Sequence, residues 1–192
     1  FFIIIYLVVL DLCLTNIYKY GKNYLINDLR IDHPNFHHTL RSNAEGGGFI
    51  SEKYYTNSLG FRDFQIRDVE KIKKNRNRIL LMGDSSTMGL YNEYENSYAG
   101  KITKYYEKKN IEVLNASVTS YSPIIYFKKL EHLIKIEELE FNKLFLFIDI
   151  SDTFDDVYRY RLNNLGDVID PKTTFDNTNY VDDVKKLIIN QF

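Results

Sequence analysis

The chain has 192 residues, of which 44% are hydrophobic, and it carries a formal net charge of −1. This length and composition suit one folded domain with a sizeable core and exclude a disordered chain. The balanced charge argues against a general nucleic-acid binder, so we expect no nucleic-acid partner. The single cysteine, Cys13, excludes both an internal disulfide and a cysteine-ligated metal centre.

The first ten residues are apolar without interruption, and residues 12–14 extend this run beyond Asp11. A full membrane span needs about 20 apolar residues, so the run is short, but it starts at the first residue. We expect residues 1–18 to form an apolar helix that is the remnant of a membrane anchor or signal anchor. The membrane would then be a partner, and the rest of the chain would be periplasmic or otherwise extracytoplasmic. A core helix is the alternative.

Residues 19–75 are predicted to form a polar and largely irregular N-terminal extension. Its glycine run at 46–48 is typical of a flexible connection, whereas Tyr54, Tyr55 and Thr56 favour a strand. The main domain is expected at residues 76–192. Its last 13 residues, "YVDDVKKLIINQF", begin as a helical pattern and stop without a cap, so we expect the C-terminal part of this domain to be missing.

Short apolar runs alternate with amphipathic segments from residue 78 onward. The expected strands lie at 78–82, 111–115 and 143–150, and the expected helices at 96–110 and 122–139. Ser122 is the candidate N-cap of the second helix, and Pro123 suits its first position. The strands lack alternation, as do strands buried on both faces of a parallel sheet. This order predicts an α/β fold, namely a doubly wound, flavodoxin-like three-layer α/β/α domain with an incomplete parallel sheet, and a long loop after Asp155.

Polar residues follow each predicted strand, at the edge where open parallel sheets bind ligands. These polar clusters are residues 83–87, 115–120 and 149–152. We expect them to meet in a cleft where a tight turn presents the Ser85 hydroxyl beside its own backbone N–H, which can stabilise an oxyanion. The hydroxyl would still need a base, because a neutral serine is a poor nucleophile. The alternative is that these polar residues only end the strands.

Three segments in this order resemble the motif blocks of the SGNH/GDSL hydrolase superfamily. They are "ILLMGDSSTMG", "VLNASVTSYSP" and "LFLFIDISD". The upstream segment "TNSLGFRD" looks like one often found in membrane-anchored or envelope members. The resemblance covers roughly residues 52–156, and it is the ordered set rather than any single motif that is specific.

The resemblance implies that Ser85 is the catalytic nucleophile, which attacks an acyl ester and forms an acyl-enzyme. The backbone N–H of Ser85 would be one oxyanion donor. Ser117 stands where the family has a glycine whose N–H is the second donor, and Ser151 stands where the family has a donating asparagine. Supporting residues would be Asp84, Asn115 and Asp152. The resemblance implies neither a cofactor nor a metal.

The general base is the largest departure from the family, whose histidine lies in a late Asp-x-x-His block. The chain has four histidines, and none has an aspartate three residues before it: His33, His37, His38 and His132. We expect the catalytic histidine to lie beyond Phe192 and the 192-residue chain alone to be inactive.

The favoured function is therefore a membrane-tethered ester hydrolase that acts on acyl or acetyl esters of envelope glycans or lipids. An O-acyltransferase of the same fold would share the first half of this reaction. A non-catalytic binding module in the envelope is the second class. A third class is a metal-dependent phosphoryl hydrolase that uses Asp84, Asp149 and Asp152, because carboxylates at strand ends suit Mg²⁺. The sequence leaves the substrate and the oligomeric state open.

Overall fold

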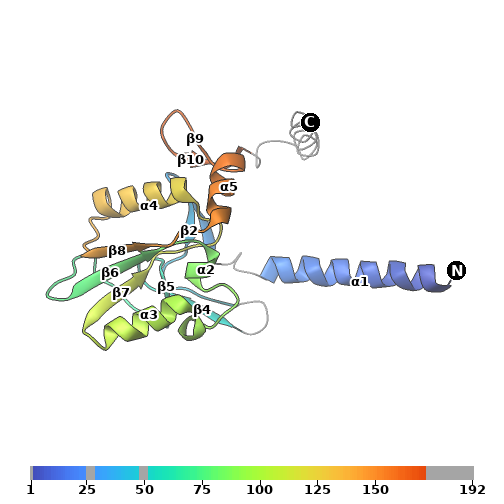
Figure 1. Cartoon of the computed structure of the whole chain (residues 1–192), viewed down its shortest axis with the longest axis horizontal. Helices are drawn as coiled ribbons and strands as arrows, with labels where there is room; N and C mark the ends of the chain where they lie inside the picture. Colours follow the sequence, from blue (N-terminus) through green and yellow to red (C-terminus); the bar gives the residue numbers. More distant parts are fainter. Residues whose placement is uncertain (1, 25–28, 48–51, 172–192) are drawn as a thin grey trace.

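A six-stranded mixed sheet with helices on both faces forms the centre of the molecule (Figure 1). The computed structural model describes residues 2–24, 29–47 and 52–171. The order of the strands across the sheet is β3-β4-β5-β7-β6-β8. Their bounds are β3 (Glu45–Gly47), β4 (Lys53–Thr56), β5 (Arg62–Asp63), β6 (Asn77–Met82), β7 (Ile111–Asn115) and β8 (Lys143–Leu146).

The half of the sheet formed by β7, β6 and β8 is parallel, as predicted. Leu80 at the centre of β6 pairs with Leu114 of β7 on one side and with Leu144 of β8 on the other. The predicted crossover helices are also confirmed, as α3 (Tyr98–Glu107) and α4 (Pro123–Lys135). The first strand of this half therefore lies between the second and the third.

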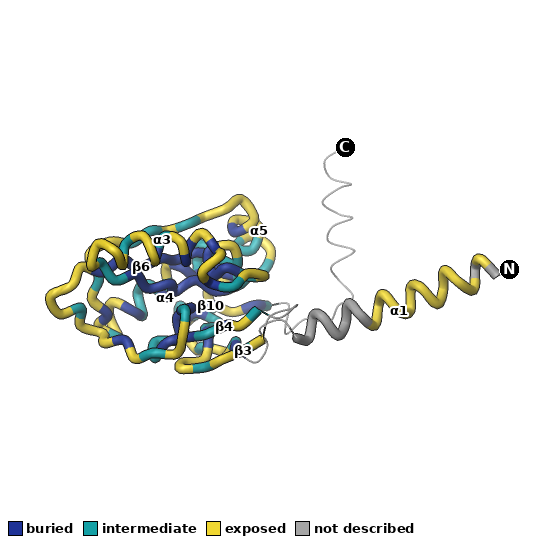
Figure 2. The backbone as a smooth tube through the Cα atoms, turned by 90° about the horizontal axis from the view of Figure 1, so that it is seen from below, coloured by how far each residue is buried: buried dark blue, intermediate teal, exposed yellow. Residues whose placement is uncertain are grey.

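The central strand β6 is apolar from Ile79 to Met82 because its two faces pack against different helices. On one face Ile79 and Leu81 of β6 pack with Ala99 of α3. On the other face Leu80 and Met82 belong to the larger core that includes residues of α4. Figure 2 shows β6 as a buried strand between more exposed layers.

The predicted incomplete parallel sheet is found only in part, because β5, β4 and β3 continue it in antiparallel fashion and make the whole sheet mixed. Arg62 of β5 pairs with Asn115 of β7, and β4 and β3 follow outward. The strand expected at residues 54–56 is thus confirmed as part of β4. Gly46 and Gly47 are not a flexible connection but belong to β3, where they pair with β4, while Gly48 lies outside the described residues.

Two further corrections concern the cap of α4 and the loop expected after Asp155. Ser122 is the N-cap residue of α4, but its hydroxyl makes no capping bond, because the carboxylate of Asp156 accepts from the Ile124 N–H at 3.1 Å instead. The loop expected after Asp155 begins later, since α5 (Ile150–Tyr158) continues through it.

Two antiparallel hairpins lie outside the central sheet. One is β1 (Arg30–His33) with β2 (His37–Leu40), and the other is β9 (Arg161–Leu162) with β10 (Val168–Ile169). The two hairpins contact each other, because the Val168 N–H donates to the Asn35 carbonyl at 3.0 Å. Asn35 Nδ2 also donates to Asp167 at 3.1 Å, across 132 positions of sequence.

The N-terminal helix α1 (Phe2–Tyr24) extends away from the sheet domain in Figure 1. The described side chains of residues 3 and 5–16 are exposed, so the structure does not support the alternative of a core helix. Among the described residues, no helix combines the length and the apolar character needed to cross a membrane. The helical pattern expected at residues 180–192 lies outside the described residues.

Candidate active site

Ser85 is the first residue of α2 (Ser85–Met88), a single turn that follows the central strand β6 through Gly83 and Asp84. The Asp84 carboxylate caps this turn by accepting from the Ser86 N–H at 2.9 Å. A Cβ at Gly83 would lie 2.1 Å from the Thr87 hydroxyl, so glycine lets strand and helix approach closely. With only four residues, α2 has a small macrodipole, and any oxyanion stabilisation must come mainly from individual N–H groups.

The Ser85 side chain is half-buried, and its hydroxyl donates to Asp84 Oδ2 at 3.2 Å. Within the described part of the chain, no group accepts a hydrogen bond from the Ser85 backbone N–H. Ser86, the next residue, has an exposed side chain. The hydroxyl and N–H of Ser85 are therefore both placed at the carboxyl end of β6, as the sequence predicts for a nucleophile in this turn.

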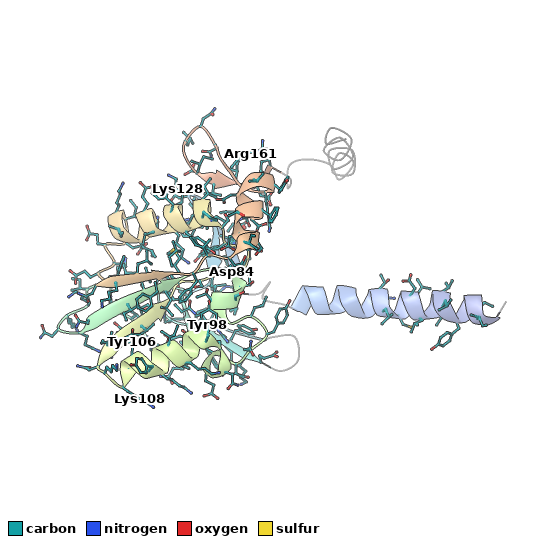
Figure 3. The ribbon with its side chains drawn as sticks, in the orientation of Figure 1. Asp84, Tyr98, Tyr106, Lys108, Lys128 and Arg161 are labelled. Carbon is teal, nitrogen blue, oxygen red and sulfur yellow. The ribbon has the colours of Figure 1, made fainter. Side chains whose placement is uncertain are left out.

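Three carboxylates gather beside Ser85 from two neighbouring strand ends. One oxygen from each of Asp84, Asp149 and Asp152 lies within 4.8 Å of the others. Figure 3 labels Asp84 at the end of the central strand, where α2 begins. Such a set of oxygen ligands could hold a hard cation such as Mg²⁺.

Two of these carboxylates also hold the start of α5. Asp149 is its N-cap, and the Asp152 carboxylate accepts from the Asp149 N–H at 3.0 Å to complete a capping box. Burial raises the pKa of Asp152, whereas the hydrogen bonds from Ser151 lower the pKa of the exposed Asp149. In this cluster the charged form of Asp149 is favoured, whereas the charged form of Asp152 is disfavoured.

Ser117, the candidate second oxyanion donor, follows the end of β7 and is fully buried. Its backbone N–H donates to Asn115 Oδ1 at 3.1 Å, and its hydroxyl has no partner among the described residues. Asn115 in turn donates to the Thr87 carbonyl at 2.8 Å and so links the end of β7 to α2. The Ser117 N–H would therefore have to leave Asn115 before it could bind an oxyanion.

Ser151, the candidate third donor, is exposed in the first turn of α5. Both its backbone N–H and its hydroxyl bind the carboxylate of Asp149. The hydroxyl is thus engaged by a neighbour, and the shorter side chain does not reproduce the free amide donor of the family pattern.

The four histidines make their described contacts with residues other than Ser85, whose hydroxyl donates to Asp84. His38 is buried, and its Nε2 lies 2.9 Å from the Thr119 carbonyl, while burial lowers its pKa to about 2. His33 and His132 pack against each other at a ring distance of 4.7 Å. Within the described residues, then, no histidine contacts the candidate nucleophile.

Two tyrosines near the site were not predicted from the sequence. Tyr126 of α4 donates to Asp152 at 2.8 Å, and the Tyr98 hydroxyl lies 2.5 Å from the hydroxyl of Thr87. Burial raises the pKa of both tyrosines. Their signal in the sequence is weak, because each is one aromatic residue in an amphipathic helix and resembles a core residue.

Comparison with known proteins adds no family to this geometry: no family model matches the chain, and no curated protein matches it. The arrangement itself is a serine in the turn that follows the central parallel strand, with hydroxyls, an amide and carboxylates at the ends of the strands on either side. This arrangement can support nucleophilic attack by a hydroxyl or the binding of a cation.

Proposed function

We propose that the protein is a serine ester hydrolase of the SGNH/GDSL type, built on a doubly wound, flavodoxin-like α/β domain. The observation that carries the proposal is the order β7-β6-β8. It puts the Ser85 turn in the middle and the other two motif blocks on the neighbouring strands, at the carboxyl edge where such sheets bind ligands. Three short motifs that resemble one superfamily thus come from adjacent strands in the order expected of it.

In the proposed reaction the Ser85 hydroxyl attacks the acyl carbonyl and the alcohol leaves, which gives an acyl-serine. Water then attacks this ester and releases the carboxylic acid and the free serine. The Ser85 N–H is suited to stabilise the oxyanion, because no described residue accepts from it. The Ser85 hydroxyl donates to Asp84 in the structure. The base of the reaction would be a histidine, and none of the described histidines contacts Ser85.

The proposed substrates are acyl or acetyl esters of envelope glycans or lipids. The resemblance of "TNSLGFRD" to a segment of envelope members supports this choice. The exposed apolar side chains of α1 support attachment to a membrane. An extracytoplasmic sheet domain is part of the proposal and follows from the proposed envelope substrates. Transfer of the acyl group to a sugar hydroxyl would use the same acyl-serine, and a binding module would use the same edge of the sheet without it.

The test is hydrolysis of p-nitrophenyl acetate by the natural full-length protein, with Ser85→Ala and the matched control Ser86→Ala. We expect Ser85→Ala to lower the rate to that of the buffer and Ser86→Ala to retain most of it. Mass spectrometry of the quenched reaction should find an acetyl group on the peptide containing Ser85. Equal rates for the wild type and Ser85→Ala would refute the proposal.

A metal-dependent phosphoryl hydrolase is the second candidate, and the close approach of Asp84, Asp149 and Asp152 favours it. It predicts p-nitrophenyl phosphate hydrolysis that a chelator abolishes, Mg²⁺ restores and Ser85→Ala leaves intact. Asp149→Asn should weaken this phosphatase activity, whereas Asp68→Asn, at an exposed position, should not. Phosphatase activity that the chelator leaves unchanged would exclude this candidate.

A further inference from the structure

A cavity of about 360 Å³ lies between the β1–β2 hairpin and helix α4. Its walls come from the β1–β2 hairpin, residues 58–61, α4 and residues 137–139, and they include Phe36, Phe61 and Lys129. None of the candidate active-site residues lines it. Its volume falls within the range of small-molecule sites, about 300–1,000 Å³.

Lys129 is the unusual residue in this wall, because its side chain is only 1% exposed. Its Nζ donates to the Ala116 carbonyl at 2.8 Å and to the Tyr121 hydroxyl at 2.9 Å. The amine also lies 5.4 Å from the ring centre of Phe61 and 5.7 Å from that of Phe36, which line the same cavity. A buried amine thus adjoins a cavity with aromatic walls.

The amine has no carboxylate partner among the described residues, and burial alone lowers its pKa to about 7. A neutral amine has two N–H groups, and the two hydrogen bonds use both. Protonation adds a third N–H, for which the described residues provide no acceptor. An ammonium in this place would therefore be desolvated and only partly compensated, which is costly unless a counter-charge arrives.

The other charges of the cavity do not supply this counter-charge. Glu137 is the acidic residue of its wall, and it already binds Lys71 at 2.5 Å and lies 3.5 Å from His132 Nε2. Burial lowers the pKa of His33 to about 4, so this ring is neutral near pH 7. The cavity therefore has walls that are partly aromatic and aliphatic and partly polar, and its basic groups outnumber its single acidic residue.

We propose that this cavity binds a small apolar monocarboxylate whose carboxylate pairs with the Lys129 ammonium. The acyl chain or ring of the ligand would contact the aromatic and aliphatic walls, and its oxygens would accept the third N–H of Lys129. A charge-assisted hydrogen bond in a dry site is stronger than one between neutral groups. The site is separate from Ser85 and does not depend on the function proposed for it.

Isothermal titration at pH 7 with octanoate and with octanol, which has the same chain and no charge, tests the proposal on the full chain. We expect octanoate to bind the wild type at least tenfold more tightly than octanol. Lys129→Met should remove this preference. The matched control is Lys128→Met, because Lys128 belongs to the same helix, pairs with Glu131 and lies on the side of α4 away from the sheet in Figure 3.

Non-specific binding to the exposed apolar residues of α1 would be the same in both lysine variants, so their difference reports the cavity. A second measurement on the wild type protects the test if Lys129→Met fails to fold. Nitrogen-15 NMR of the lysine amines should find that octanoate raises the pKa of Lys129 and leaves Lys128 unchanged. Equal affinities for octanoate and octanol, or an unchanged Lys129 resonance, would overturn the proposal.

Discussion

The Asp152 carboxylate serves two helices at once. It accepts from the Asp149 N–H at the start of α5 and from the Tyr126 hydroxyl of α4. Because the carboxylate and the phenol are both buried, neither has water as a substitute partner. The residue that the family resemblance marks as a supporting aspartate thus has a structural task that is independent of catalysis.

Asp152→Ala is expected to lower the free energy of unfolding by roughly 1–3 kcal/mol, because it removes the close acceptor of the buried Tyr126 hydroxyl and leaves only the Tyr121 carbonyl at 3.5 Å. Urea denaturation measures this change. Tyr126→Phe removes the donor instead, so the double variant should lose less than the sum of the two single changes. Strict additivity would mean that the hydrogen bond contributes nothing.

The lowered pKa of Lys129 predicts that the free energy of unfolding depends on pH, and it sets the sign of this dependence. Between about pH 7 and 10.5 the unfolded chain binds a proton that the folded chain does not, so stability rises with pH in this window. Below it both states are protonated and the penalty of the buried charge is constant. Lys129→Met lacks this gain, because methionine carries no titratable group.

The difference in unfolding free energy between the wild type and Lys129→Met should therefore shift in favour of the wild type from pH 7.5 to pH 9.5. The shift should not exceed about 1.4 kcal/mol for each pH unit. Urea denaturation at the two pH values checks it, and parallel profiles for the two proteins would contradict it.

At the scale of elements, α3 packs directly on the backbone of the 3-10 turn η1 (Tyr94–Asn96). A Cβ at Gly100 would lie 1.8 Å from the Tyr94 carbonyl oxygen. This contact explains why a glycine, which is a poor helix former, stands inside α3. Close approach of two backbones is more important here than helix propensity.

Gly100→Ala is expected to destabilise the protein by roughly 1–3 kcal/mol through overpacking, although alanine gains about 1 kcal/mol in helix propensity. The control is Gly47→Ala, because a Cβ at Gly47 meets no atom within 4 Å. Thermal melts of both variants measure the effect. If the two variants had equal melting temperatures, the packing argument would fail.

Sequence alone predicts where the three parallel strands lie, because each contains a short apolar run followed by polar residues, although the third strand ends at Leu146 rather than at residue 150. It does not predict β5, since Arg62 and Asp63 are charged and are buried only through tertiary contacts. The Arg62 guanidinium stacks 3.9 Å from the Tyr54 ring centre, and Asp63 binds Asn57 and Arg67. Helix α5 is polar enough to resemble a loop, although Asp149 and Asp152 carried its capping signal.

The candidate site, too, could be predicted from the sequence only in part. The turn at Ser85 and the gathering of Asp84 with Asp149 follow from the motif order and the parallel sheet. The engagement of the Ser117 N–H by Asn115 does not follow, because it depends on one side-chain conformation. The position of the histidines could not be predicted either, since it depends on tertiary contacts of the β1–β2 hairpin and of helix α4.

At the scale of the whole molecule, the N-terminal extension is part of the central sheet and of its core. Strands β3, β4 and β5 come from it, as do the buried residues Phe36, Leu40 and Phe61. Helix α1, in contrast, extends away from the sheet domain (Figure 1). The boundary at residue 76 therefore does not separate two packed units.

A chain that lacks residues 1–75 is expected not to fold, because it loses half of the sheet and uncovers the edge of β7. A chain that lacks residues 1–24 should keep a cooperative unfolding transition close to that of the intact protein. Circular dichroism melts and size-exclusion chromatography compare the two. A cooperative transition for residues 76–192 alone would contradict this prediction.

The contact between the two outer hairpins has a consequence for the speed of folding. Asn35 and Asp167 meet across 132 positions, so their hydrogen bond closes a loop that spans most of the described chain. Closing a long loop costs conformational entropy, and topologies rich in such long-range contacts fold slowly. During synthesis the β1–β2 hairpin cannot form its hydrogen bonds to Asp167 and Val168 until β10 has left the ribosome.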